Sequence, residues 1–287
     1  QYLRQYVRTM PSESCTNTGR NIMSSHQDLL YSAQDGVAHI VLNKPEKKNA
    51  LNPEMRTALW QALARASADA DVRAVLISGA GNDFCSGGDV SVMATTDSDA
   101  EGGRNRIDPV TRGARSLLEL QKPVIVAVDG CAYGIGFSLA LAADVVVATP
   151  RSRFCLSFMR LGLVPDGLAL FTLPRVIGWT RAKKMLYSAQ EIDGQTASDY
   201  GIVTELAEPE ALIKRASAVA TALASASPAA FALTKNALLR SFSSDASAVM
   251  DMEINGQGIA YSTRYHKDAV QAFMRKQPLA FSWPGKG

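Results

Sequence analysis

Three short, almost continuously apolar segments limit the folds that are open to this chain. They are VRAVLISG at 72–79, PVIVAVDG at 123–130 and VVVAT at 145–149. Runs of this length that are rich in valine and isoleucine are typical of parallel strands covered on both faces. Helical stretches separate them, and alternating strands and helices require right-handed crossover connections. The sequence therefore predicts an α/β core.

A further strand and helix precede these segments. GVAHIVLN at 36–43 has the pattern of a strand, and a polar turn follows it. Asn52 has the features of a helix N-cap, and Pro53 stands at the first helical position. We expect the buried face of this helix to consist of Met55, Leu59, Ala62, Leu63 and Ala66.

Beyond about Thr180 the strand signals end and helical patterns remain. Ser227 and Pro228 mark the start of one of them, and the patterns cover 181–189, 210–225, 228–242 and 267–276. The polar stretch 91–108 is rich in Gly, Ser and Asp, which favours a mobile surface loop. We expect three parts: a non-catalytic extension at 1–28, an α/β core at 29–210 and a C-terminal helical region at 211–287.

The composition of the chain excludes some classes of function. The chain has 287 residues with a formal net charge of +3, too small and scattered to indicate a nucleic-acid partner. No apolar run reaches the roughly 18 residues that span a bilayer, so no membrane partner is expected. The cysteines form no C-x-x-C pair, which argues against a disulfide framework or a zinc site and favours a reducing cytoplasm; they are Cys15, Cys85, Cys131 and Cys155.

Two of the predicted strands end in glycine-containing turns. AGNDFCSGGDV at 80–90 follows the first, and DGCAYGIGFSLALAAD at 129–144 follows the second. Glycine lets another group approach the backbone closely, and a helix that starts after the second turn directs its free N–H groups back at that turn. One Gly-x-Gly alone is a weak signal. Two such turns facing each other would present two N–H donors to one oxygen, which is an oxyanion hole.

Four stretches in this order resemble the crotonase superfamily, also called the enoyl-CoA hydratase/isomerase family. They are NKPEKKNALN, AVLISGAGNDFCSGGDV, KPVIVAVDGCAYGIGFSLALAADVVVAT and LGLVPDGLALFTLPRVIG, and the resemblance extends from Leu29 to the C-terminus. It implies a spiral core of ββα turns with a C-terminal helical region. It also implies an acyl-CoA thioester substrate, no metal and no separate cofactor, and assembly into homotrimers or dimers of trimers.

The resemblance also assigns residues. The thioester oxygen is expected to accept hydrogen bonds from the backbone N–H groups of Gly88 and Ile135. Because the donor is the main chain, an isoleucine is acceptable at 135. The expected CoA-binding residues are Asn49, Ala50, Leu51, Ser86, Lys276 and Phe281.

Hydratases of this family use two glutamates, and the matching positions here are Ser138 and Phe158. Addition of water across a double bond is work for paired carboxylates, and a serine hydroxyl has no useful basicity without an adjacent base. Simple hydration is therefore not favoured. Ser138 and Phe158, together with Val164, are expected to border the acyl pocket instead.

One acid does stand where the isomerase branch of the family carries its own. Asp166 follows Pro165 at a turn before an apolar run. A single carboxylate suffices for a double-bond shift, because it can remove a proton from C2 and return it to C4 while the oxyanion hole holds the dienolate. Apolar neighbours would raise its basicity; the candidates are Leu163, Val164, Leu168 and Phe158. Taken locally, Asp166 is instead a favoured helix N-cap.

Two alternatives stay open. First, the protein could be a hydratase that takes its acid from the polar stretch, at Asp97, Asp99 or Glu101. Second, it could be a catalytically weak module that binds acyl-CoA.

Several other reactive side chains are expected to be structural. They are Asp89, Asp144, Cys85 and Cys131, while the role of Asp129 is not indicated.

Overall fold

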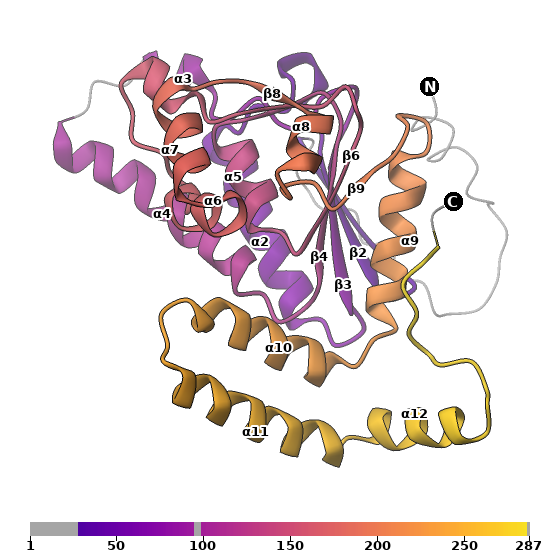
Figure 1. Ribbon diagram of the computed structural model, residues 1–287. Coiled ribbons are helices and arrows are strands. Elements are labelled where there is room, and N and C mark those ends of the chain that lie inside the picture. Colours follow the sequence, from indigo (N-terminus) through magenta and orange to yellow (C-terminus); the bar gives the residue numbers. More distant parts are fainter. Residues whose placement is uncertain (1–27, 95–98, 286–287) are drawn as a thin grey trace, which may run out of the picture.

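The computed structural model of the chain describes residues 28–94 and 99–285, so most of the expected extension lies outside it. Its centre is a six-stranded sheet in the order β1-β2-β3-β4-β6-β9 (Figure 1). The first pair is antiparallel and the others are parallel. The strands are β1 (Leu29–Gln34), β2 (Val37–Leu42), β3 (Ala74–Gly79), β4 (Val124–Val128), β6 (Val145–Ala148) and β9 (Glu205–Leu206). The expected α/β core is confirmed.

A second, three-stranded sheet has the order β5-β7-β8. Its strands are β5 (Cys131–Tyr133), β7 (Arg153–Cys155) and β8 (Ile192–Asp193). The expectation that strands end before Thr180 is wrong, because β8 and β9 follow it. Each of these two strands has only two residues, which is too short for a hydrophobic period to appear in the sequence.

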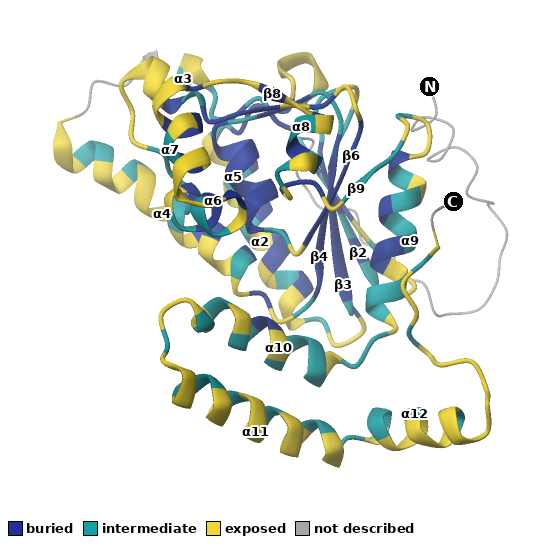
Figure 2. Ribbon diagram, in the orientation of Figure 1, coloured by how far each residue is buried: buried dark blue, intermediate teal, exposed yellow. Residues whose placement is uncertain are grey.

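Helices cover both faces of the main sheet (Figures 1 and 2). The apolar side chains of α2, α4 and α5 share one core cluster with Val75 and Val126, and those of α9 share another with Leu76 and Ile125. The helices are α2 (Pro53–Ala68), α3 (Val90–Ala94), α4 (Ala100–Leu118), α5 (Ile135–Ala142), α6 (Ala169–Ile177), α7 (Trp179–Ser188), α8 (Gly194–Asp199), α9 (Leu212–Ala224), α10 (Pro228–Ser241), α11 (Ala246–Ser262) and α12 (Arg264–Met274), with 3-10 turns η1 (Pro45–Lys47) and η2 (Ser157–Leu161).

Helix α2 forms as the sequence predicts. The Asn52 side chain accepts a hydrogen bond from the Met55 N–H at 2.8 Å, and Pro53 occupies the first turn. This cap satisfies one of the N–H groups that the start of a helix leaves unpaired. Every residue of the expected apolar stripe is buried: Met55, Leu59, Ala62, Leu63 and Ala66.

The polar stretch 91–108 is not the loop that its composition favours. Helix α4 begins within it, where the Asp99 side chain accepts a hydrogen bond from the Gly102 N–H at 2.8 Å. The helix buries Val110, Ala114 and Leu117, so tertiary packing outweighs the low helix propensity of its glycines. Residues 95–98 lie outside the described part of the chain.

Helix α9 belongs to the α/β unit, although the expected boundary at 210 places it in the helical region. It packs on β3 and β4 and buries Leu212, Ala216, Val219 and Ala220. The helices that project from the core begin at α10 (Figure 1). Neither α11 nor α12 has a buried residue.

No single helix in the described part of the chain is long and apolar enough to cross a membrane. Helices α9 and α10 meet that test only as a pair, with a bend of 104° between them, and by length and composition alone.

Candidate active site

The two glycine turns lie directly against each other. The Cys85 N–H donates a hydrogen bond to the Cys131 carbonyl, and the Tyr133 N–H donates one to the Cys85 carbonyl, both at 2.9 Å. A Cβ atom on Gly136 would stand 2.5 Å from the Cys85 oxygen, so the contact requires glycine at that position. The structure therefore brings together the two turns that the sequence singled out.

Both expected N–H donors are left available at this contact. The Leu51 N–H donates to the Gly87 carbonyl at 2.8 Å. Since the C=O and the next N–H of a trans peptide point in opposite directions, the Gly88 N–H points away from Leu51. Ile135 is the first residue of α5, so its N–H has no partner within the helix. Across the described residues, neither N–H donates a hydrogen bond to the chain.

The turn that carries Asp166 packs on the start of α5. Gly167 has a φ of +62°, and a Cβ there would lie 2.4 Å from Ile135 Cδ1 and 2.8 Å from Ser138 Cβ. The Ser138 hydroxyl donates a hydrogen bond to the Asp166 backbone carbonyl at 2.9 Å. The candidate base and the candidate oxyanion helix are thus in direct contact.

The interpretation of Asp166 as a helix cap is wrong. The N-cap of α6 is Leu168, and no side chain caps that helix. The Oδ1 atom of Asp166 is buried and has no hydrogen-bond partner among the described residues. Burial raises the pKa of this carboxyl to about 6, while the positive charge of Arg56 on α2 acts in the opposite direction. Sequence reasoning missed Arg56, because no local pattern relates it to a turn 110 residues away.

The expected apolar neighbours of Asp166 are only partly in place. Phe158 is buried in η2 and lies beside Gly134, whereas Val164 is 75% exposed and Leu163 is 43% exposed. The segment that contains Leu163 and Val164 has no regular secondary structure. In the single chain, Val164 therefore does not line a closed acyl pocket.

Four of the expected CoA-binding residues lie near Gly88 on two connected segments: Asn49, Ala50 and Leu51 on one, and Ser86 on the first glycine turn. The buried Asn49 side chain accepts from the Lys44 N–H at 2.8 Å and donates to the Ala80 and Asp83 carbonyls. Ser86 donates its N–H to the Lys48 carbonyl at 3.0 Å. Asn49 therefore fastens its segment to the first glycine turn. Ala50 and Leu51 are buried within the same segment, and the CoA contacts of all four residues stay predictions.

Lys276 and Phe281 are not brought to these turns within one chain. They belong to the segment after α12, which runs back along α9 (Figure 1). Arg215 of α9 donates hydrogen bonds to the carbonyls of Pro284 and Gly285. Because α9 covers the sheet face opposite α5, the core sheet separates this segment from the second glycine turn.

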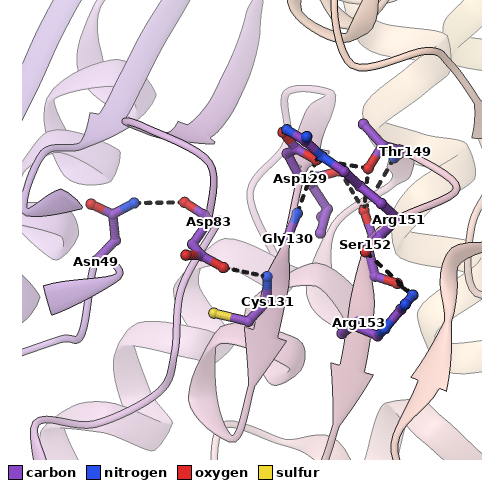
Figure 3. A network of polar contacts seen from close by, with 10 residues as sticks. Asn49, Asp83, Asp129, Gly130, Cys131, Thr149, Arg151, Ser152 and Arg153 are labelled. Atoms are coloured by element: carbon purple, nitrogen blue, oxygen red, sulfur yellow. Dashed lines mark hydrogen bonds and ion pairs between the residues drawn. The ribbon is translucent and has the colours of Figure 1, made fainter. Parts of the chain in front are cut away.

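The role of Asp129, which the sequence left open, is structural. Figure 3 shows it in a network with Thr149 and Arg151 at the end of β4. Arg151 Nε and the Thr149 hydroxyl each donate a hydrogen bond to Asp129 Oδ1 at 2.8 Å. Burial acts to raise the pKa of this carboxyl, but the hydrogen bonds outweigh it and hold the pKa below its ordinary value. The network supports the segment that leads into the second glycine turn.

The other carboxylates that the sequence considered also have structural partners. Asp89 accepts hydrogen bonds from the Ser91 N–H and hydroxyl, and Asp144 accepts from Lys235 and from the Val124 N–H. Asp99 caps α4. Of the remaining two candidate hydratase acids, Glu101 is exposed and Asp97 lies outside the described residues.

The thiols and the strand histidine are held in unreactive forms. Burial raises the pKa of the Cys85 and Cys131 thiols to about 12, so neither is a thiolate nucleophile at neutral pH. His39 of β2 is hydrogen-bonded to the Ser78 hydroxyl at 2.9 Å. Burial lowers its pKa to about 4. The described residues contain no group of His, Cys, Asp or Glu side chains that could hold a metal ion.

The family model of enoyl-CoA hydratase/isomerase matches residues 32–284 of this chain. The chain belongs to the enoyl-CoA hydratase/isomerase family. A crystal structure of an enoyl-CoA hydratase/isomerase from Cupriavidus metallidurans CH34 superposes with a TM-score of 0.88 at 38% identity, over 92% of this chain and 100% of the other. The fold is therefore the crotonase fold, and the chain is an acyl-CoA-processing enzyme of this superfamily.

Relatives within the family carry the names of two different reactions. A probable enoyl-CoA hydratase from Rhodobacter capsulatus is 35% identical over 90% of this chain and 99% of its own length. The 1,2-epoxyphenylacetyl-CoA isomerase of Escherichia coli is 30% identical over 88% of this chain and 98% of its own. Family membership thus defines the class of substrate, and the choice of reaction depends on the site.

Proposed function

We propose that this enzyme is an enoyl-CoA isomerase that shifts a double bond with Asp166 as its single acid–base group. The observation that carries the proposal is Asp166 Oδ1, which is buried without a hydrogen-bond partner among the described residues, on a turn that contacts the start of α5. A raised pKa of about 6 suits a group that must both accept and return a proton near neutral pH. Neither position of the hydratase glutamates carries an acid, since they are Ser138 and Phe158.

The proposed reaction begins with a 3-enoyl thioester whose carbonyl oxygen lies between the N–H groups of Gly88 and Ile135. Asp166 removes a proton from C2, and the electrons move into the thioester to give a dienolate. The two N–H groups and the N-terminal end of α5 stabilise the negative charge on oxygen. The protonated Asp166 then delivers the proton to C4, which leaves the double bond between C2 and C3.

The test is an assay of the purified protein with 3-enoyl-CoA and 2-enoyl-CoA thioesters, with the wild type and Asp166→Asn. We expect the wild type to interconvert the two thioesters. We expect Asp166→Asn to lower kcat by at least about 100-fold, the range that one general acid–base group contributes. Hydration that survives in Asp166→Asn would contradict the proposal and favour a hydratase with another acid. Tight thioester binding without turnover by the wild type would favour an acyl-CoA-binding module.

We also infer that the enzyme assembles into homotrimers or dimers of trimers. Large apolar side chains are exposed along α11 and α12, among them Met250, Ile254, Phe273 and Met274, at 53%, 61%, 70% and 76%. Exposed apolar area of this kind marks an interaction surface. Such an assembly would allow Lys276 and Phe281 to reach the CoA site of a neighbouring subunit.

A further inference from the structure

Ser138 lies at the contact between the two parts of the candidate active site. Its side chain is fully buried in the first turns of α5. The hydroxyl is 2.9 Å from the Asp166 carbonyl and 3.2 Å from the Gly134 carbonyl. A serine hydroxyl has one proton to donate, and bonds to the carbonyl four residues earlier are common for serines in helices. The shorter contact is the one that crosses between elements.

This contact holds a turn that has few other anchors. Within the described part of the chain, the Asp166 and Leu168 carbonyls otherwise accept hydrogen bonds only from residues of the α6 segment, namely the Ala169, Phe171 and Thr172 N–H groups and the Thr172 hydroxyl. Among the described residues, the Ser138 hydroxyl makes the only hydrogen bond between residues 164–168 and another helix or strand. The position of the turn therefore depends on this bond and on packing.

The turn and α5 are also closely packed at the same point. Gly167 has its Cα so close to α5 that a Cβ would lie 2.8 Å from Ser138 Cβ and 3.3 Å from Ser138 Oγ. Because the turn and the helix are in such close contact here, we expect a much longer side chain at 138, such as glutamate, to press on the turn.

We propose that Ser138 is a positioning residue, whose hydroxyl fastens the Asp166 turn to the oxyanion helix and so fixes the carboxylate relative to the Gly88 and Ile135 donors. The inference rests on the proposed function, because it assigns Ser138 to the same proton transfer. It gives the serine a role beyond bordering the acyl pocket. The residue touches no reacting atom and acts through Asp166.

The test compares Ser138→Ala with Ser152→Ala as a matched control. Ser152 is likewise fully buried and donates to a main-chain carbonyl, that of Val128 at 2.9 Å, but it has no contact with the Asp166 turn. For both variants, kcat and KM are measured with a 3-enoyl-CoA thioester from pH 5 to pH 9, alongside thermal unfolding. Asp166→Asn is assayed in the same series.

We expect Ser138→Ala to lower kcat by about 10- to 100-fold with little change in KM, because a small displacement of a catalytic group has an effect of this size. We also expect the acid limb of its pH–rate profile to move to lower pH, since a loosened turn admits water to Asp166. Ser152→Ala is expected to keep the wild-type kcat and profile. An unchanged kcat and profile in Ser138→Ala, or changes that Ser152→Ala shares, would overturn the inference.

A second variant tests whether the close packing of α5 on the Asp166 turn excludes a longer side chain at 138. Ser138→Glu is expected to lose isomerisation without gaining hydration, because the new side chain displaces the Asp166 turn. Retained isomerisation in this variant would contradict the proposed packing. The two proposals can fail separately. Isomerisation that persists in Asp166→Asn contradicts the proposed function. If Asp166→Asn loses isomerisation but Ser138→Ala keeps the wild-type kcat and pH–rate profile, only the role of Ser138 is contradicted.

Discussion

Burying a carboxyl oxygen without a hydrogen-bond partner costs free energy, and Asp166 Oδ1 has none among the described residues. The proposed isomerisation requires a proton acceptor at this position. The pKa of about 6 means that folding favours the protonated form relative to the unfolded chain. Stability from this residue is therefore present at low pH and is lost as the pH rises through about 6.

The sign of this linkage predicts the behaviour of Asp166→Asn. The variant carries no charge to bury, so we expect it to be more stable than the wild type by about 1–3 kcal/mol at pH 8, with a smaller difference at pH 5. Urea unfolding at the two pH values measures this. The exposed Asp71→Asn serves as the control, with no comparable gain. A variant that is less stable than the wild type at pH 8 would show that the carboxylate is well solvated or paired.

At the scale of one element, α10 shows how the projecting helices are attached to the core. Lys235 is 7% exposed, and its Nζ lies 2.8 Å from Asp144 Oδ2, directly after α5. Burial raises the pKa of the Asp144 carboxyl, while Lys235 opposes that shift. Removing one partner of a buried pair leaves the other charge uncompensated, which is more costly than losing both.

We expect Lys235→Met to lower the free energy of unfolding by about 3–5 kcal/mol, and Lys235→Met combined with Asp144→Asn to recover part of that loss. Urea unfolding at pH 7 measures both variants. Arg112→Met on α4 is the matched control, since Arg112 pairs with Asp108 at the exposed surface and little change in its unfolding midpoint is expected. A double variant no more stable than Lys235→Met would contradict this account.

Elements also differ in how well the sequence predicts them. Helix α2 was predicted because its cap, its first-turn proline and its apolar stripe agree. Helix α4 was not, because Gly102, Gly103 and Pro109 favour a loop and only packing against the core outweighs them. The short strands β8 and β9 have no sequence period of their own, and pairing with β7 and β6 creates them.

At the scale of the whole molecule, helices α10 to α12 project from the core (Figure 1) and carry exposed apolar side chains. In Figure 2 the surfaces of α11 and α12 carry no buried residues, in contrast to the sheet and α5. We expect the proposed assembly to cover these helices. Burying exposed apolar area is the main favourable contribution to such an association.

This expectation is tested with Ile254→Glu on α11, at a side chain that is 61% exposed. Because a charge at a buried contact is costly, the variant should have a lower mass than the wild type in size-exclusion chromatography with light scattering. Circular dichroism should remain native, and Glu253→Gln should assemble like the wild type. A monomeric wild type, or a variant of unchanged mass, would contradict the proposed assembly surface.

The sequence by itself determined the α/β class, the resemblance to the family and the position of the two glycine turns, because these depend on local features. Apolar runs, caps and glycines act within a few residues of where they stand. The sequence alone also shows that neither position 138 nor position 158 carries a glutamate.

Only the tertiary structure decided what Asp166 does in the fold. In sequence, Asp166 can cap a helix or be buried, and the fold decides between the two: no side chain caps α6, and Asp166 Oδ1 is buried without a hydrogen-bond partner among the described residues. The same holds for Asp129, whose partner Arg151 is 22 residues away, and for Ser138, whose hydroxyl reaches a carbonyl 28 residues away. Burial, and with it pKa, depends on contacts between distant segments, which no local pattern contains.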